Sequence, residues 1–313
     1  MTMLRELWDF IRTHRLKKRY RRGLLAVLGI VLILIVGGVY VHAYVRQTTQ
    51  APVKPRTNQI QSLTKAELTK RQHELGTYYD QLAATGKVQV SYVSLAPEPG
   101  SKAAKAPQAF DHRNRWTISA GATTKVQSAS TYKLYIAAYV FHRLEAGKLP
   151  WTLTDRANFD AMIVNSDNGY AQTILTRHGN DTVDAYIKTL GIQPVFAGDA
   201  AETTAADLVK ILKLLDAGKG PFADAKLRAR LLKDMGKQVY RNGIPAGVAS
   251  VDKHATVQDK VGFLTQTNND AGIVTTKDGH RYILVIMTTG HEQLDFSQIK
   301  TIAARTQQIV YSD

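Results

Sequence analysis

Ser130 and Lys133 are the two residues whose types and spacing most directly suggest chemistry. They stand at the start of an apolar stretch over 130–145, which predicts a buried helix. Residues three apart share one face of a helix, so Lys133 lies one turn from the Ser130 hydroxyl. A serine needs a base to attack, and a desolvated lysine loses its proton well below its ordinary pKa of about 10.4. The pair predicts nucleophilic catalysis by serine; the alternative is a serine that caps the helix beside a solvated lysine.

The Ser-x-x-Lys spacing is not rare in this chain. It also occurs at 62–65, 250–253 and 297–300. Ser130 differs because it opens a long apolar helix, whose N-terminal N–H groups and dipole favour developing negative charge. This context makes 130–133 the candidate nucleophile segment.

Two further polar triplets lie downstream. Ser-Asp-Asn stands at 166–168, before a predicted helix, and Lys-Val-Gly stands at 260–262, inside an apolar strand. Taken alone, Ser166 and Asn168 can be helix caps, and Lys260 can protect the edge of a sheet. Taken together with Ser130, they suggest one polar site built from three distant segments.

The elements that must position these residues follow from hydrophobic periodicity. Strands at both ends of the folded part, around a helical middle, predict an α/β (α+β) fold with one mixed, mainly antiparallel sheet and an all-helical subdomain. Helices are expected at 65–84, 130–145, 169–177, 182–190, 205–215, 225–233 and 296–310, and strands at 88–95, 115–119, 256–264, 270–276 and 282–289.

In this order, the Ser-x-x-Lys, Ser-Asp-Asn and Lys-x-Gly groups resemble the class A β-lactamase and penicillin-binding-protein superfamily of serine hydrolases. Three further segments are similar to that family: TTAADL at 203–208, NDAGIV at 269–274 and MTTG at 287–290. The resemblance covers roughly residues 65 to 313. It implies a β-lactamase-like fold and acylation of a serine by β-lactams or peptidoglycan stem peptides, without a cofactor or metal.

The resemblance also assigns roles. Ser130 would be the acylated nucleophile and Lys133 its base, while Ser166 would pass a proton to the leaving nitrogen. Lys260, across the cleft, would supply positive potential for this proton transfer and for a substrate carboxylate. Asn168 would bind the substrate amide and Lys133, and Gly262 would let ligand approach the strand. The backbone N–H groups of Ser130 and Phe263 would form the oxyanion hole.

Two departures from the family pattern affect the expected activity. Val261 stands where the family has Thr or Ser, so the hydroxyl that would bind a substrate carboxylate is missing. The segment before Thr203 lacks the family's Glu-x-x-x-Asn pattern, and its carboxylates, Asp199 and Glu202, do not match in position. Because hydrolysis of the acyl-enzyme needs a placed water and base, we expect acylation with slow deacylation.

The N-terminal region predicts a membrane anchor. Residues 1–22 hold eight Lys or Arg against two carboxylates, and an uncharged apolar run follows over 23–45. At about 1.5 Å per residue, such a helix spans a hydrocarbon core of about 30 Å. The positive-inside pattern then places 1–22 in the cytoplasm and the hydrolase domain, 63–313, outside the cell membrane, which is a type II topology. Residues 46–62 between the anchor and this domain are expected to form an extended linker. The alternative is a cleaved signal peptide, whose apolar core is usually shorter.

Composition limits the remaining classes. The chain of 313 residues has no cysteine, which excludes disulfide scaffolds, thiolate metal sites and cysteine nucleophiles, and its nine histidines show no paired spacing that indicates a metal site. The net charge of +15 is partly explained by the N-terminal cluster, so nucleic-acid binding is disfavoured.

We expect a monomer. The alternatives are a non-catalytic cell-wall binding or regulatory module of the same fold, and a glutaminase-like amidase, which the expected export disfavours.

Overall fold

The computed structural model describes residues 65–105 and 116–311. The predicted cytoplasmic tail, anchor and linker, over 1–62, lie outside the described residues. Within the described ranges, no helix has the length and apolar character needed to cross a bilayer.

The centre of the folded part is a five-stranded sheet with the order β2-β1-β7-β6-β5. Its neighbouring strands all pair antiparallel, whereas the sequence predicted a mixed, mainly antiparallel sheet. The strands are β1 (Val88–Ser94), β2 (Thr117–Ala120), β5 (Thr256–Leu264), β6 (Thr267–Thr275) and β7 (Arg281–Thr289); a separate two-stranded pair joins β3 (Val126–Gln127) and β4 (Glu202–Thr203).

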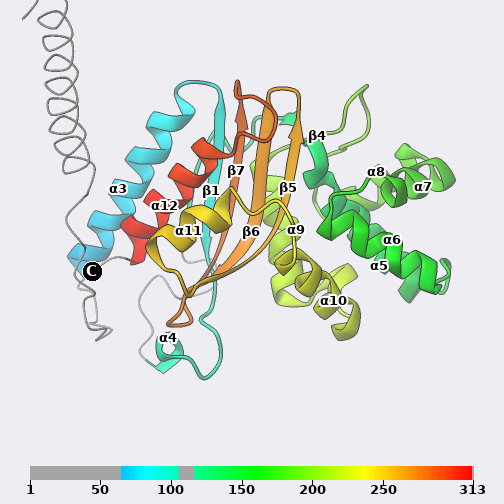
Figure 1. Cartoon of the computed structure of the whole chain (residues 1–313), viewed down its shortest axis with the longest axis horizontal. Helices are drawn as coiled ribbons and strands as arrows, with labels where there is room; N and C mark the ends of the chain where they lie inside the picture. The colour runs from blue at the N-terminus through cyan, green and yellow to red at the C-terminus, as the bar shows by residue number, and fades with distance from the viewer. Residues whose placement is uncertain (1–64, 106–115, 312–313) are drawn as a thin grey trace, which may run out of the picture. The chain divides into compact units, whose positions relative to one another are not determined.

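Both faces of the sheet are covered. In β7, Ile283 and Val285 belong to the core beneath one face, while Tyr282 and Leu284 belong to the core beneath the other. This alternation explains why the strand reads as a continuous apolar run. Helices α3 (Lys65–Ala83), α11 (Ile244–Val251) and α12 (Ser297–Tyr311) lie together on one face (Figure 1).

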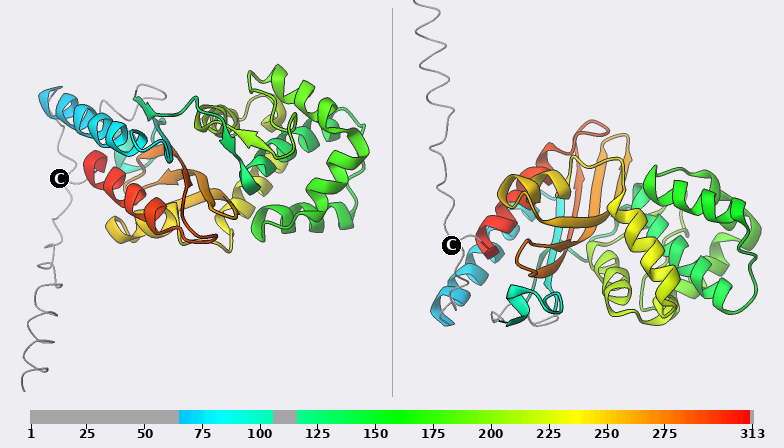
Figure 2. Two further views of the ribbon diagram at one scale, coloured as in Figure 1. Left: turned by 90° about the horizontal axis from the view of Figure 1, so that it is seen from above. Right: turned by 60° about the horizontal axis from the view of Figure 1, so that its bottom comes forward.

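The helical part lies beside and behind the sheet (Figure 2). Its central helix, α5 (Lys133–Glu145), is buried from Lys133 to Phe141, as the apolar sequence predicted. The surrounding α-helices are α6 (Leu153–Val164), α7 (Gly169–His178), α8 (Asn180–Thr189), α9 (Ala205–Ala217) and α10 (Ala225–Gly236); a short α4 (Lys102–Lys105) follows β1.

The sequence analysis missed the short α4 and two longer helices, α6 and α11. Helix α6 begins with a capping box in which Thr152 and Asp155 satisfy each other's backbone N–H groups, and this Thr-x-x-Asp spacing was a usable signal. Helix α11 contains a proline and a glycine, which obscured its periodicity. Strand β6 begins at Thr267, three residues before the predicted start, because its polar Asn268 and Asn269 are buried and hydrogen-bonded.

Candidate active site

Ser130 lies in a short 3₁₀ turn, Ala129–Tyr132, that leads into α5. The α-helix itself begins at Lys133, so the nucleophile sits just before the predicted regular helix. Ala129 has a φ of 42°, a left-handed conformation that non-glycine residues adopt at a cost. Thr131 Oγ1 donates to Ser128 O at 2.7 Å and braces the turn. The turn, with its backbone strain at Ala129, therefore holds Ser130 in a fixed position at the start of the buried helix.

Lys133 is buried and has three hydrogen-bonding neighbours. Its Nζ lies 2.8 Å from Ser130 Oγ, 2.6 Å from Ser166 O and 2.7 Å from Asn168 Oδ1. The latter two oxygens only accept hydrogen bonds. A neutral amine has two N–H groups and one lone pair, so these oxygens take both N–H groups and the lone pair faces the Ser130 hydroxyl. This is the geometry of a base for Ser130.

The environment of Lys133 favours its neutral form. Burial lowers its pKa from 10.5 to about 8, although the charge of the nearby Asp167 acts in the opposite direction. The ammonium form still predominates near physiological pH, but the neutral fraction is far larger than for an exposed lysine. The sequence predicted a desolvated lysine beside Ser130, and Lys133 is buried with its Nζ 2.8 Å from Ser130 Oγ.

Ser166 and Lys260 form the opposite wall. The fully buried Lys260 Nζ donates to Ser166 Oγ at 2.8 Å and to Val261 O at 2.9 Å. Ser166 has a φ of 58°, so it is a second site residue in the left-handed region. That conformation presents its carbonyl to Lys133 and its hydroxyl to Lys260, and thereby connects the two lysines.

Burial lowers the pKa of Lys260 well below its ordinary value, and the positive charge of Lys133 acts in the same direction. Asp259 and Asp270 partly oppose this change. Two buried amines in one site disfavour a state in which both are charged. One of the two amines is therefore favoured in its neutral form, which can accept the proton of Ser130.

Gly262 brings β5 against the turn that carries Ser130. A Cβ at this position would lie 2.7 Å from Ser128 O and 2.8 Å from Ser130 N. The sequence analysis expected Gly262 to leave room for a ligand; in the structure that room is taken by backbone. Phe263, whose backbone N–H is the expected second oxyanion donor, is the next residue of β5 after this contact.

Val261 has no exposed surface. Its side chain belongs to the core under α11 and α12, on the opposite face of the sheet from Lys260. Its carbonyl, which accepts from Lys260 Nζ, is the part of this residue that takes part in the polar network.

Sequence reasoning gave no role to Asn269. This fully buried residue donates from Nδ2 to Gln127 O at 2.9 Å and to Ser128 O at 3.1 Å. It thus ties strand β6 to the segment before Ser130. An asparagine inside an apolar strand was the available signal, because a buried amide requires partners.

A second polar network was also missed, on the far side of Lys260. Asp259 and Asp270 are fully buried carboxyl groups on neighbouring strands, and Arg241 Nη1 donates to Asp259 Oδ1 at 2.5 Å. Ile244 N donates to Asp270 Oδ2 at 2.8 Å. Burial raises the pKa of Asp270 to about 6 and that of Asp259 well above its ordinary value, so both carboxyl groups keep their protons to higher pH than exposed ones.

The sequence analysis found no glutamate that matches the deacylating residue of the family. Asp199 and Glu202 are the carboxylates of the segment before Thr203. Both are exposed, and Glu202 pairs with Gln127 between β4 and β3. Within 65–105 and 116–311, no carboxylate hydrogen-bonds to Ser130 or Lys133. The same ranges contain no cluster of acidic and histidine side chains suited to a metal ion.

The antiparallel sheet, the adjoining helical part and a Ser-x-x-Lys turn between them define a protein with the β-lactamase-like fold. Residues 150–312 match the model of the Beta-lactamase enzyme family. The chain belongs to that family. The matched region contains Ser166, Asn168 and Lys260, whereas Ser130 and Lys133 precede it.

Solved structures agree on the fold. The structure of PBP-A has a TM-score of 0.60 and 19% identity, covering 78% of this chain and 95% of that one. A PBP-A variant, an acyl-enzyme complex with penicillin G, has the same TM-score and identity, covering 78% and 96%. A β-lactamase from Sphaerobacter thermophilus has a TM-score of 0.58 and 18% identity, covering 79% and 97%. No curated protein matches the chain.

Proposed function

We propose that this protein is a serine hydrolase that acylates Ser130 with β-lactams or peptidoglycan peptides. The observation that carries the proposal is the position of Lys133 Nζ, 2.8 Å from Ser130 Oγ and held by two acceptor-only oxygens. The family and the PBP-A acyl-enzyme complex with penicillin G support the substrate class.

The proposed reaction begins when Ser130 Oγ attacks the substrate carbonyl carbon and its proton passes to Lys133 Nζ. The carbonyl oxygen becomes an oxyanion, which the N–H groups of Ser130 and Phe263 stabilise. The bond from carbon to the leaving nitrogen then breaks, and that nitrogen takes the Ser166 hydroxyl proton, which Lys260 or Lys133 replaces. The product is an ester on Ser130, and water later releases the acid.

Deacylation is proposed to be slow. The ester needs a water activated by a base, and the carboxylates before Thr203 do not reach Ser130 or Lys133 by hydrogen bonds. Lys133 must therefore serve both steps. We expect turnover of a chromogenic cephalosporin far below the 10–10³ per second that is the order of magnitude for good enzymes.

A non-catalytic cell-wall binding module is the second candidate. It is favoured by Val261, whose buried side chain supplies no hydroxyl for a substrate carboxylate, and by the exposed positions of Asp199 and Glu202. A binding module would retain its cellular role after Ser130→Ala, whereas a hydrolase would lose it.

The test is intact-mass spectrometry of the full-length protein with benzylpenicillin, beside Ser130→Ala. A persistent adduct on the parent alone supports the proposal. A transient adduct with loss of the drug contradicts slow deacylation and indicates an efficient β-lactamase. No adduct with intact drug favours the binding module.

We also propose that residues 23–45 anchor the chain in the cell membrane, with 63–313 outside. The apolar run and the basic cluster before it support this topology. Protease treatment of intact cells expressing the chain tests it, because an external domain is digested and an internal one is protected.

A further inference from the structure

The polar neighbours of Lys133 Nζ leave little room for water. The amine is bonded to one carbon, and its three remaining directions point to Ser130 Oγ, Ser166 O and Asn168 Oδ1, at 2.8, 2.6 and 2.7 Å. Lys133 is also the base that must activate water for hydrolysis of the proposed acyl-enzyme. That water must therefore displace one of these neighbours or approach through the apolar side of the amine.

The apolar side is formed by the ring of Tyr132. Lys133 Nζ lies over this ring, 5.8 Å from its centre. Lys133 has no exposed surface, whereas Tyr132 is only partly buried, so the ring separates the amine from part of the surrounding solvent. A water between ring and amine would have few polar partners, and a bound water in a protein typically needs about two to four. The ring therefore hinders the approach of water to Lys133.

Tyr132 is held in place by Phe196. Their rings meet edge to face, with centroids 5.5 Å apart and planes at 85°. Phe196 is buried in the core of the helical part. Its N–H donates to Asp184 Oδ2 at 3.0 Å, and its carbonyl accepts from Asn180 Nδ2 at 3.3 Å. Phe196 therefore cannot move away without breaking these bonds, and Tyr132 keeps its place beside Lys133.

The segment that carries Phe196 is fastened to the nucleophile turn. Ser128 N and Ser128 Oγ both donate to Ala201 O, at 2.8 and 2.9 Å. These bonds lie two residues before Ser130, so the segment and the turn are held together. An apolar ring thus stays beside the turn in the free protein and in the acyl-enzyme.

We propose that Tyr132, braced by Phe196, excludes the hydrolytic water from the acyl-enzyme and thereby makes the ester on Ser130 long-lived. The inference rests on the proposed acylation of Ser130. In the step that Tyr132 hinders, water attacks the ester carbonyl carbon while one of its protons passes to Lys133 Nζ. The bond from that carbon to Ser130 Oγ then breaks, Oγ takes the proton from Lys133, and the acid leaves. Tyr132 forms no bond in this step and acts on the access of water alone.

Loss of the adduct from labelled protein tests the inference. Full-length protein is labelled with benzylpenicillin and freed of excess drug, and the adduct on Ser130 is followed by intact mass, so the acylation rate does not enter. We expect Tyr132→Ala to lose the adduct about tenfold faster than the parent, a small part of the roughly 10²–10⁴-fold that a general base contributes. Tyr132→Phe keeps the ring and should keep the parent rate. Equal rates in Tyr132→Ala and the parent overturn the inference and leave the proposed function intact, whereas a parent that is not labelled overturns both.

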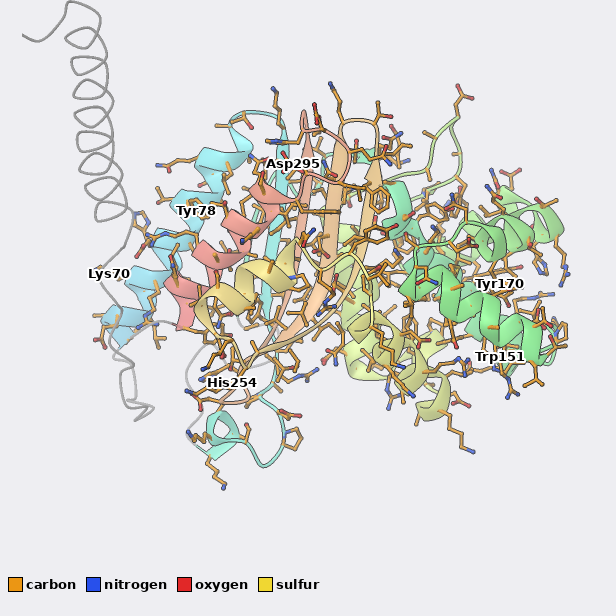
Figure 3. All side chains as sticks on the ribbon, viewed as in Figure 1. Lys70, Tyr78, Trp151, Tyr170, His254 and Asp295 are labelled. Atoms are coloured by element: carbon orange, nitrogen blue, oxygen red, sulfur yellow. The ribbon has the colours of Figure 1, made fainter. Side chains whose placement is uncertain are left out.

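Phe196→Leu decides the question if Tyr132→Ala does not fold. Leucine keeps the core apolar but removes the edge-to-face contact, so we expect the adduct to be lost severalfold faster than in the parent. Tyr78→Ala is the matched control, because it also removes a partly buried tyrosine beside another aromatic ring, that of Tyr79 at 6.0 Å. Tyr78 lies on α3 and packs against the core beneath the other face of the sheet, away from the helical part (Figure 3). A parent-like rate in Phe196→Leu overturns the inference, and so does an equal gain in Tyr78→Ala, which would reduce the effect to a loosened fold.

The pH dependence separates water activated by Lys133 from hydroxide that enters a loosened fold. In Tyr132→Ala, loss of the adduct should rise with pH and reach a plateau once Lys133 is neutral. Attack by hydroxide would instead increase with each further pH unit. A profile without a plateau between about pH 6 and 11 overturns the role of Tyr132.

Discussion

Lys260 Nζ and Ser166 Oγ, from residues 94 positions apart in the chain, form a hydrogen bond of 2.8 Å across the site. The bond joins strand β5 of the sheet to the segment between α6 and α7. Through Ser166 O it reaches Lys133, so sheet and helical part share one polar network. A change in either part therefore alters the environment of Ser130.

Lys133→Arg is expected to slow acylation strongly. Arginine retains the positive charge but does not release its proton in proteins, so the base is lost. We expect the rate of Ser130 acylation to fall by about 10²–10⁴-fold, the usual contribution of a general base. Intact-mass kinetics with benzylpenicillin measure the rate. Lys188→Arg, on the exposed side of α8, is the control, and an unchanged rate in Lys133→Arg would exclude Lys133 as the base.

The acylation rate is expected to rise with pH. Lys133 accepts the Ser130 proton only as a neutral amine, and burial lowers its pKa to about 8. Below that pH the ammonium form predominates and the rate falls; above it the rate reaches a plateau. A pH profile between 6 and 10 measures the midpoint, and a rate independent of pH in this range would contradict the assignment.

The Asp259–Asp270 pair is expected to make the fold less stable as the pH rises. Burial raises the pKa of Asp270 to about 6, whereas the unfolded value is about 3.9. The folded state therefore binds more protons, and stability present below about pH 4 is lost as the pH passes 6. A shift of about 2 units corresponds to roughly 3 kcal/mol.

Asp270→Asn tests this pair because it preserves shape and removes one titrating group. Between pH 4 and 7, the free energy of unfolding should fall less in Asp270→Asn than in the parent. Urea denaturation at several pH values measures the difference, with the exposed Asp80→Asn as control. Parallel pH curves for parent and Asp270→Asn would show that the pair does not titrate as inferred.

Gly262→Ala is expected to destabilise the protein and to slow acylation. The added Cβ overlaps backbone atoms of Ser128 and Ser130, and relief of such a contact typically costs about 1–3 kcal/mol. Gly76→Ala is the control, since its Cβ meets nothing within 4 Å and glycine in a helix is about 0.5–1 kcal/mol worse than alanine. Thermal unfolding and acylation rates check both variants. Equal stability of the two would indicate that β5 moves freely away from the turn.

The sequence predicted the elements whose pattern is local. The apolar run after Ser130 identified α5, and the spacing of Ser130 and Lys133 placed both on one side of the turn. The order of the polar triplets predicted that distant segments meet, and the structure joins Lys133 to Asn168 and Ser166 to Lys260.

What the sequence could not predict depends on contacts between segments. In the sequence, Asp259 and Asp270 look like isolated polar residues in two strands. The strand register pairs Val261 with Asp270 and thereby places the two carboxyl groups on one face of the sheet. The role of Gly262 likewise depends on which backbone approaches it. Such relations follow from tertiary packing and have no local signature.

The pairing of β1 with β7 determines when the protein can fold. Val88 pairs with Thr288, and the whole helical middle lies between them. Strand β1 therefore has no partner on that side until the last strand has been synthesised. Closing so long a segment makes folding slow and leaves strand edges open in the interim. Chaperones that hold the emerging chain should therefore raise its yield.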